Sequence, residues 1–265
     1  ESIEVTSIAS ISGTLNKDDG LIQTRPFRSP HHSSSAVSLI GGGTWPMPGE
    51  ISLAHRGVLF LDELPEFPRH VIEHLRQPLE DGTVTIARSH ATVKFPAQFI
   101  LVAAMNPCPC GYASDPKHPC ICSHMQIQNY KKRVSGPLLD RFDLRIEVSN
   151  LSKDVLLNEA RTESSTEIRL RVTDARKKQT MRFTENIHHL NTSIPPHLLD
   201  HFCPITPEAR ILLGQAIELQ NLSPRGCTRV RKVARTIADL SNFDLITEDH
   251  LAEALQFRGI NGVER

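Results

Sequence analysis

The positions of the apolar residues predict a sheet in the first half of the chain. Continuous apolar runs at residues 57–61 and 99–104 are typical of strands that are buried on both faces, as in a parallel sheet. A further strand is predicted at 144–148. Residues 83–87 and 91–95 are rich in β-branched residues and flank a short polar tip, which predicts a hairpin.

Helical periodicity is found in most of the remaining sequence. Apolar residues recur at helical spacing over 68–80, and helices are also predicted within 1–20 and over 124–134. Residues 24–50 are rich in Pro, Gly, Ser and His, which favours irregular structure. Beyond about residue 150 the chain is predicted to be helical throughout. The predicted segments there are 152–181, 195–202, 207–221, 225–241 and 247–258.

These two patterns predict two domains, an α/β core over residues 1–149 and a helical domain over residues 150–265. The 30 basic residues balance the 30 acidic ones, so the overall charge favours neither nucleic acid nor a membrane as partner and leaves only local basic patches to consider. No apolar run approaches the roughly 18 residues needed to span a bilayer, and no signal peptide opens the chain. We therefore expect a cytoplasmic protein without a membrane partner.

Two adjacent carboxylates, Asp62 and Glu63, directly follow the first apolar run. Acidic residues at the carboxyl end of a buried strand lie where open α/β sheets bind ligands. Such a pair can divide the work of ATP hydrolysis, with Asp62 holding Mg²⁺ and Glu63 polarising the attacking water. The alternative is a core strand that ends in two solvated acids.

Further residues are candidates to act with this pair. Asn106 follows the second apolar run and is a candidate to orient the water or sense a γ-phosphate, although an Asn before proline is also typical of a turn. Arg141, in Leu-Leu-Asp-Arg-Phe-Asp, is either an arginine finger for a neighbouring subunit or a surface residue paired with nearby acids. Arg225 is a candidate second phosphate sensor, with Arg229 and Arg231 as alternatives.

The sequence contains no G-x-x-x-x-G-K-[ST] phosphate-binding loop. Its only glycine cluster, residues 41–43, lacks the lysine that must follow. The chain starts at Glu1 rather than at Met, so we expect an excised segment that begins after that loop. Without the backbone amides and the lysine that hold the β- and γ-phosphates, this segment is expected to have negligible ATPase activity by itself.

In their order along the chain, these motifs resemble Walker B, the presensor hairpin, sensor 1, the arginine finger and sensor 2 of AAA+ ATPases. More narrowly, four blocks resemble the bacterial magnesium-chelatase-like proteins of the ComM/YifB type, which are similar to magnesium chelatase I subunits and minichromosome-maintenance helicases. The blocks are RPFRSPHH (25–32), PGEISLAH (48–55), VLFLDELPEF (58–67) and VARTIADL (233–240). The resemblance covers nearly the whole chain.

The resemblance implies an AAA+ parallel-sheet core that is truncated at its N-terminus and followed by a helical lid. It also implies a helix-2 insert within residues 24–56 and a presensor hairpin at 83–95, which in helicase relatives line the channel of a hexamer and touch nucleic acid. Arg88, His90 and Lys94 are then candidate DNA contacts, whereas their charge alone indicates a solvated tip. The implied cofactors are ATP and Mg²⁺, and the implied partner is a homo-hexamer.

Two other features of the insert segment have simpler interpretations. His31 and His32 are adjacent in a predicted loop, so their side chains are expected to point apart and to have a polar role rather than to bind a metal. Trp45, the single tryptophan, is expected to be a packing anchor, with base stacking as the alternative.

Four of the six cysteines form a C-x-C…C-x-C pattern: Cys108, Cys110, Cys120 and Cys122. Four thiolates are a complete ligand set for structural zinc, although this spacing is tighter than the usual C-x₂-C. Disulfides are disfavoured in the cytosol, and incidental free thiols do not usually cluster. We therefore predict a Zn²⁺ site, with His118 and His124 as substitute ligands, and expect Cys203 and Cys227 to be ordinary buried thiols.

Three functions are consistent with these features. The first is an ATPase motor that acts on DNA as a hexameric helicase or branch-migration engine. The second is a chelatase-type motor that remodels a protein partner. The third is a zinc-bearing module for DNA binding or oligomerisation, without enzymatic activity. Nothing in the sequence indicates a tetrapyrrole pocket, so insertion of magnesium into a porphyrin is the least favoured activity.

Overall fold

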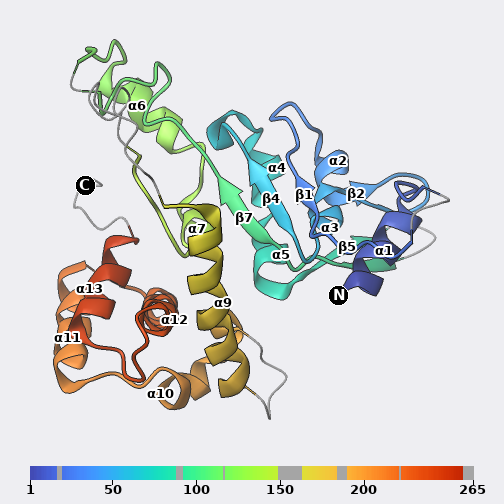
Figure 1. Cartoon of the computed structure of the whole chain (residues 1–265). Coiled ribbons are helices and arrows are strands. Elements are labelled where there is room, and N and C mark those ends of the chain that lie inside the picture. Colours follow the sequence, from blue (N-terminus) through green and yellow to red (C-terminus); the bar gives the residue numbers. More distant parts are fainter. Residues whose placement is uncertain are drawn as a thin grey trace. The chain divides into compact units, whose positions relative to one another are not determined.

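The chain forms two compact units, Glu1–Phe142 and Asp143–Arg265, which we call unit 1 and unit 2 (Figure 1). The boundary predicted at residues 149 and 150 lies outside the part of the chain that the structure describes. This computed structural model describes residues 1–16, 20–87, 92–115, 117–148, 163–183, 190–220 and 222–258. No helix among these residues is long and apolar enough to cross a membrane.

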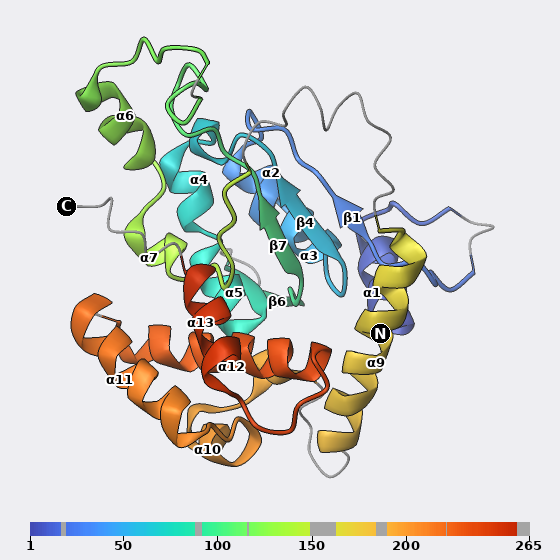
Figure 2. The ribbon, with the colours of Figure 1, turned by 60° about the vertical axis from the view of Figure 1, so that its left-hand side comes forward.

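A parallel sheet of three strands lies at the centre of unit 1, in the order β1 (Phe27–Arg28), β4 (Val58–Leu61) and β7 (Ile100–Ala103) (Figure 2). The strands predicted at 57–61 and 99–104 are thus confirmed. β4 and β7 pair over four residues, from Val58 opposite Ile100 to Leu61 opposite Ala103. The segments that follow these two strands therefore leave the sheet at the same edge.

Two antiparallel hairpins accompany this sheet. The predicted hairpin is confirmed as β5 (Thr83–Ala87) and β6 (Thr92–Pro96), and its tip lies outside the described residues. The second hairpin, β2 (Gly41–Gly42) with β3 (Met47–Pro48), was not predicted. Its strands approach so closely at Gly41 that a Cβ atom there would lie 2.3 Å from the Met47 carbonyl oxygen.

The helices of unit 1 are short. They are α1 (Ser2–Ile11), α2 (Ala36–Ile40), α3 (Glu50–Leu53), the 3₁₀ turn η1 (Leu64–Glu66), α4 (Arg69–Glu73), α5 (Arg76–Asp81), α6 (His124–Lys131) and α7 (Gly136–Leu139). The single helix predicted over 68–80 is wrong, because it is divided into α4 and α5. Pro78 has no N–H to donate to the His74 carbonyl, so the helix is interrupted one turn before it.

The segment 24–50 is more regular than its composition predicts. It contributes β1, α2 and the β2–β3 hairpin, and Leu39 of α2 is fully buried in the core of unit 1. Ser35 begins α2 by accepting a hydrogen bond from the Ser38 N–H. One serine of this segment is therefore a helix cap. Composition alone does not distinguish such a serine from a loop residue.

Among the described residues, the side chains on only one face of the parallel sheet are buried. Leu59 and Leu61 of β4 pack against helical residues that include Ile72 and Leu75. On the opposite face Phe27 and Ile100 are each 65% exposed. The expectation that these strands are buried on both faces is therefore met on one face alone.

The strand predicted at 144–148 is wrong. These residues are described, and they form no strand. Leu144, Ile146 and Val148 are exposed, and the Arg145 N–H donates a single hydrogen bond to the Phe257 carbonyl. Strand propensity depends on neighbouring strands that supply a hydrogen-bonded ladder, and the described part of the chain supplies none for this segment.

Unit 2 is helical, as predicted. Its elements are α9 (Ser165–Arg182), the 3₁₀ turns η2 (Asn191–Ser193) and η3 (Pro196–Leu198), α10 (Leu199–Phe202), α11 (Pro207–Gln220), α12 (Pro224–Leu240) and α13 (Glu248–Gln256). Ser164 and Ser223 cap α9 and α12 through their side chains. The apolar face of α12, including Val230 and Ala234, lies in a core that also contains Leu251 of α13.

Candidate functional site

The two carboxylates follow β4 in a tight turn at the carboxyl edge of the sheet. Asp62 Oδ1 accepts a hydrogen bond of 2.9 Å from the Glu63 N–H, which fixes the Asp62 carboxylate over the turn. Glu63 has a left-handed backbone conformation, with φ of 51° and ψ of 46°. This region is uncommon for a residue with a long side chain, and such residues are concentrated at functional sites. Both carboxylates are exposed.

Backbone hydrogen bonds join this turn to the end of β7. The Ala104 N–H donates to the Leu61 carbonyl, and the Leu64 N–H donates to the Ala104 carbonyl, each at 2.9 Å. The turn from Leu61 to Leu64 is therefore bonded to Ala104. Asn106 lies two residues after Ala104 and is exposed at the same edge. The structure thus brings Asp62, Glu63 and Asn106 to one edge of the sheet.

His32 contacts the candidate catalytic glutamate. Its Nδ1 atom lies 3.1 Å from Glu63 Oε2. The imidazole also packs against two rings, with centroids 4.1 Å from His31 and 6.4 Å from Phe67. The expectation that the two histidines point apart is wrong, because their rings lie against each other. No sequence pattern predicts the contact with Glu63, since the strand β1 that precedes His32 and pairs with β4 is only two residues long.

Tyr130 and Arg133 approach the same edge from α6 and the turn after it. Tyr130 is buried, and burial, followed by the negative charge of Glu66, raises the pKa of its phenol, while a hydrogen bond with the Asn106 backbone acts in the opposite direction. Arg133 Nη1 donates to Glu66 Oε2 at 2.9 Å and to the Pro65 carbonyl at 3.3 Å. Neither residue was a candidate from the sequence, because both are brought here by the tertiary fold.

Arg141 donates hydrogen bonds to three residues of unit 1. Its guanidinium donates to the Pro137 carbonyl at 2.6 Å, to the Arg76 carbonyl at 3.1 Å and to the Glu80 carboxylate. Glu80 on α5 is more distant in the sequence than the acids that were predicted as partners of Arg141. To act as an arginine finger, Arg141 would have to exchange these bonds for a phosphate of a neighbouring subunit.

The three arginines near the start of α12 differ in their surroundings within unit 2. Arg229 forms an ion pair of 2.7 Å with Asp143. Arg231 donates to Asp200 and to two backbone carbonyls, and its side chain is mostly buried. Arg225 is exposed in the first turn of the helix. All three arginines therefore stay candidates for the phosphate sensor, and Arg225 is favoured because it is exposed at the start of the helix.

Lys94 and Trp45 are accessible in unit 1. Lys94 is exposed on β6, where it pairs across the hairpin with Thr85. Arg88 and His90, the other candidate DNA contacts, lie outside the described residues. Trp45 is 81% exposed in the turn between β2 and β3, so the expectation that it is a packing anchor is wrong.

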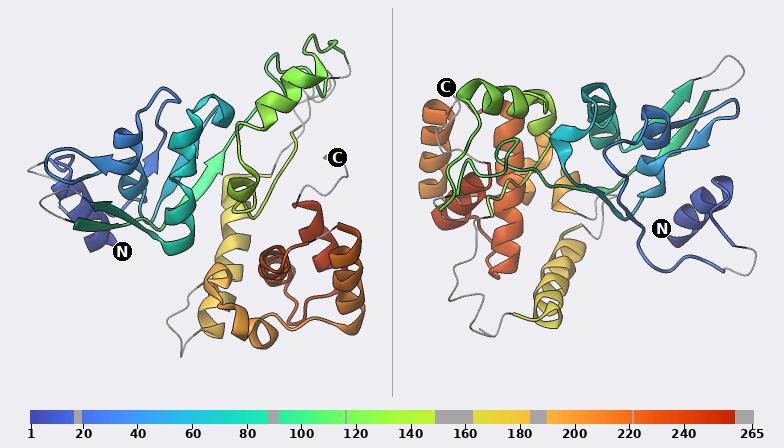
Figure 3. Two further views of the ribbon diagram at one scale, coloured as in Figure 1. Left: turned by 180° about the vertical axis from the view of Figure 1, so that it is seen from behind. Right: turned by 90° about the horizontal axis from the view of Figure 1, so that it is seen from above.

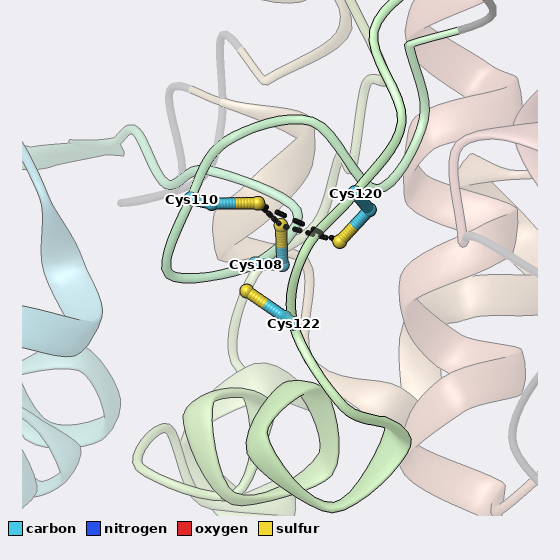
Figure 4. Close-up of side chains that lie close together, drawn as sticks. All are labelled: Cys108, Cys110, Cys120 and Cys122. Carbon is cyan, nitrogen blue, oxygen red and sulfur yellow. Dashed lines mark hydrogen bonds between the residues drawn. The ribbon is translucent and has the colours of Figure 1, made fainter.

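The four clustered cysteines converge as predicted (Figure 4). Their Sγ atoms all lie within 4.8 Å of one another, with separations of 3.4, 3.5 and 3.7 Å among Cys108, Cys110 and Cys120. Four sulfurs around a tetrahedral Zn²⁺ would be about 3.8 Å apart, so this donor set fits the ion closely. Among the described residues, this is the only such group of potential metal ligands, and neither His118 nor His124 belongs to it.

The thiols also show electrostatic competition within the cluster. A hydrogen bond from the Tyr112 backbone, together with others from the cluster, lowers the pKa of Cys110 to about 6. For Cys120 the backbone of Cys122 favours the thiolate, but burial and hydrogen bonds with Cys110 and Cys108 outweigh it and raise the pKa to about 12. Close thiols stabilise one thiolate at the expense of the next, and a bound cation would stabilise all of them. Elsewhere, Cys203 is fully buried and Cys227 half-buried.

Comparisons with known proteins agree with this geometry. The family model described as magnesium chelatase, subunit ChlI, matches residues 1–156, and the model of its C-terminal part matches residues 162–258. Competence protein ComM of Haemophilus influenzae is 45% identical over 98% of this chain and 50% of its own length. Protein YifB of Escherichia coli is 44% identical over 89% of this chain and 46% of its own length.

A more distant relative is the magnesium-chelatase 38 kDa subunit of Acidiphilium rubrum, which is 25% identical over 77% of this chain and 52% of its own length. The chain spans about half the length of the curated relatives that it matches. The parallel sheet with a helical C-terminal part is the architecture predicted for an AAA+ core and lid. The chain therefore belongs to the magnesium chelatase ChlI family and is similar to its ComM and YifB relatives.

Proposed function

We propose that the natural protein is an AAA+-type ATPase whose hydrolytic residues are Glu63 and Asn106. The observation that carries the proposal is the turn after β4, which is hydrogen-bonded to the end of β7 and presents Asp62, Glu63 and Asn106 at one edge. Open α/β sheets bind their ligands at this edge. Membership of the magnesium chelatase ChlI family supports the same activity.

The residues of this edge have distinct roles in the proposal. The Asp62 carboxylate would hold Mg²⁺, since one of its oxygens accepts the Glu63 N–H and the side chain is otherwise exposed. The ion would neutralise charge on the β- and γ-phosphate oxygens. Glu63 would accept a proton from the attacking water, and Asn106 would orient that water. ATP hydrolysis by this mechanism also requires a phosphate-binding loop, and this sequence contains none.

Replacement of Glu63 by Gln in the full-length protein tests this proposal. The amide keeps the shape of the side chain but cannot accept the proton, so we expect kcat for ATP hydrolysis to fall by about 10²–10⁴-fold while nucleotide binding is retained. The matched control is Glu208→Gln, an exposed glutamate of α11, which should leave kcat unchanged. Equal kcat values for Glu63→Gln and the unchanged protein would contradict the proposal.

We further propose that DNA is the substrate of this motor and that the protein acts as a homo-hexamer in the cytoplasm. Support comes from the exposed Lys94 on the β5–β6 hairpin and the exposed Trp45 of the β2–β3 turn. An exposed aromatic ring can stack on an unpaired base, and a lysine can contact phosphate. The similarity to a competence protein points in the same direction. In the ring, Arg141 would act on a neighbouring subunit and Arg225 would sense the phosphate.

Titrations with forked DNA separate the DNA motor from a protein-remodelling motor. We expect Trp45→Ala to weaken binding to single strands by about 1–3 kcal/mol, because one stacking platform is lost. Lys94→Gln should weaken binding to all sequences and reduce the salt slope by about 1. Lys177→Gln, on an exposed position of α9 in unit 2, is the control. If neither variant differs from the control and DNA leaves the ATPase rate unchanged, the protein-remodelling motor is favoured.

A further inference from the structure

The segment between Asn106 and α6 has no apolar core of its own. Among its described residues, those from 107 to 123 form no helix or strand, and Cys108 is the single buried one. Tyr112 and Ile121, the large apolar residues of this segment, are both exposed. A segment of this length cannot be held in one conformation by burial of so little surface. The Asp115–His118 ion pair of 3.0 Å and the Tyr112–His118 ring contact both involve the exposed His118, whereas the four sulfurs of the cysteine cluster converge within the segment.

The cysteine cluster joins the end of one element to the start of another. Cys108 lies two residues after Asn106, and Cys122 directly precedes Ser123, the N-cap of α6. Ser123 and Gln126 form a reciprocal capping box, so the start of α6 is well defined. Figure 3 shows that this loop and α6 extend beyond the carboxyl end of β7. A metal ion held by the four sulfurs would therefore tie the end of β7 to the start of α6.

The far end of α6 returns to the candidate catalytic edge. Tyr130 is 5% exposed, and the Asn106 backbone opposes the rise that burial causes in its pKa, which indicates that Asn106 lies beside the phenol. Arg133, just after the helix, binds Glu66 and the Pro65 carbonyl in the turn that follows Glu63. The chain therefore leaves the sheet at Asn106, passes through the cysteine cluster and α6, and returns to Asn106. The end of α6 also contacts the turn that follows Glu63.

We propose that a metal ion bound by the four cysteines, with zinc as the ion that the donor set fits, positions Asn106 against the Asp62–Glu63 turn. The expected effect on kcat rests on the proposed function, whereas the expected effect on the structure of the site does not. α6 acts as a strut: the metal fixes its start, and Tyr130 and Arg133 hold its end against the two segments of the site. Tyr130 is in this scheme a positioning residue, not a catalytic one.

The experiment compares the full-length protein in three states: with zinc, stripped by a chelator, and restored with ZnCl₂. The structural readout is amide exchange at Leu64 and Ala104, whose N–H groups join the two segments. We expect stripping to accelerate this exchange by at least about tenfold and zinc to reverse it. In parallel, kcat should fall by at least about tenfold while KM for ATP changes by less than about threefold, because the strut orients hydrolytic groups rather than the phosphate-binding loop.

Two phenylalanine substitutions distinguish the positioning role of α6 from the binding of the metal. Tyr130→Phe keeps the buried ring and should retain zinc, yet it should accelerate exchange at Ala104 and lower kcat in the zinc-loaded protein. Tyr112→Phe alters the exposed tyrosine within the loop and is the matched control, expected to change neither quantity. The reversible stripping does not depend on any variant that fails to fold.

Each outcome decides the inference. It is overturned if the protein retains no zinc after incubation with ZnCl₂, if stripping accelerates exchange only within residues 108–122, or if Tyr130→Phe behaves as Tyr112→Phe does. If the full-length protein hydrolyses no ATP in any state, the proposed function fails. The exchange data would then still show whether the metal positions Asn106.

Discussion

His55, at the end of the turn after α3, is buried as a neutral imidazole. Its side chain is 2% exposed, and Nδ1 accepts a hydrogen bond of 3.0 Å from the Gln98 N–H. The proton therefore resides on Nε2, which lies 3.5 Å from Glu4. Burial, followed by the positive charge of Arg56, lowers the pKa of His55, and Glu4 offsets only part of this effect. Folding thus favours the uncharged ring.

The lowered pKa of His55 predicts that unit 1 loses stability in mild acid. In the unfolded chain the imidazole has a pKa of about 6.5, so the contribution is complete above that pH and is lost as the pH falls towards the lower folded pKa. Urea unfolding at about pH 7.5 and about pH 5.5 measures the difference. His55→Gln should show a smaller loss between the two pH values, whereas His124→Gln, at an exposed position of α6, should keep it. Equal losses in both variants would contradict this assignment.

For single residues, the sequence predicts those members of the candidate site that directly follow a strand. Asp62, Glu63 and Asn106 were candidates because apolar runs end at them, and the parallel register of β4 and β7 brings them together. His32 and Tyr130 were not candidates as partners. Each comes from a distant part of the chain, and their contacts depend on a two-residue strand and on the direction of α6. Spacing along a sequence carries no information about such contacts.

The helices of unit 2 are joined by a buried ionic network centred on Asp239 of α12. Its carboxylate accepts hydrogen bonds from Arg182 at the end of α9, from Asn191 of η2 at 2.8 Å and from Arg235. Asp239 is completely buried, and Arg235 is 1% exposed. Burial would raise the pKa of Asp239, but these partners outweigh it and lower the pKa. Three elements of unit 2 therefore depend on one carboxylate.

Replacement of Asp239 by Asn should be strongly destabilising. The amide leaves the buried Arg235 without a compensating charge, and breaking a buried pair in this way costs about 3–5 kcal/mol. Asp174→Asn, which changes an exposed aspartate of α9, should cost less than about 0.5 kcal/mol. Denaturant unfolding monitored by circular dichroism measures both. A cost for Asp239→Asn as small as that of the control would show that the network contributes no net stability.

Elements were predictable where their signals are local. The helices of unit 2 follow apolar periodicity and begin at serine caps such as Ser164 and Ser223, and the β5–β6 hairpin is specified by two β-rich runs around a polar tip. The errors arise where tertiary context decides. Residues 144–148 have strand propensity but no neighbouring strand among the described residues, and Pro78 divides a helix that apolar spacing alone makes continuous.

For the whole molecule, the two hydrophobic cores belong to different units. The core of unit 1 is formed by residues between Leu39 and Leu138, and that of unit 2 by residues between Phe183 and Leu255. Each core buries its own helices, and the ionic network of Asp239 lies entirely within unit 2. A cooperative unfolding transition corresponds to the loss of one such core. The chain should therefore show two transitions rather than one.

Paired variants test this expectation by scanning calorimetry, with amide exchange to assign each transition. Leu59 is fully buried in β4, so Leu59→Ala should cost about 2–5 kcal/mol and lower the midpoint of unit 1 by several degrees. Asp239→Asn should lower the midpoint of unit 2 in the same way, and each variant should leave the other midpoint in place. The double variant should show both shifts, each of the same size as in the single variant, because the two sites share no partners. A single transition that both variants shift equally would mean that the two cores unfold as one, whatever their separation along the chain.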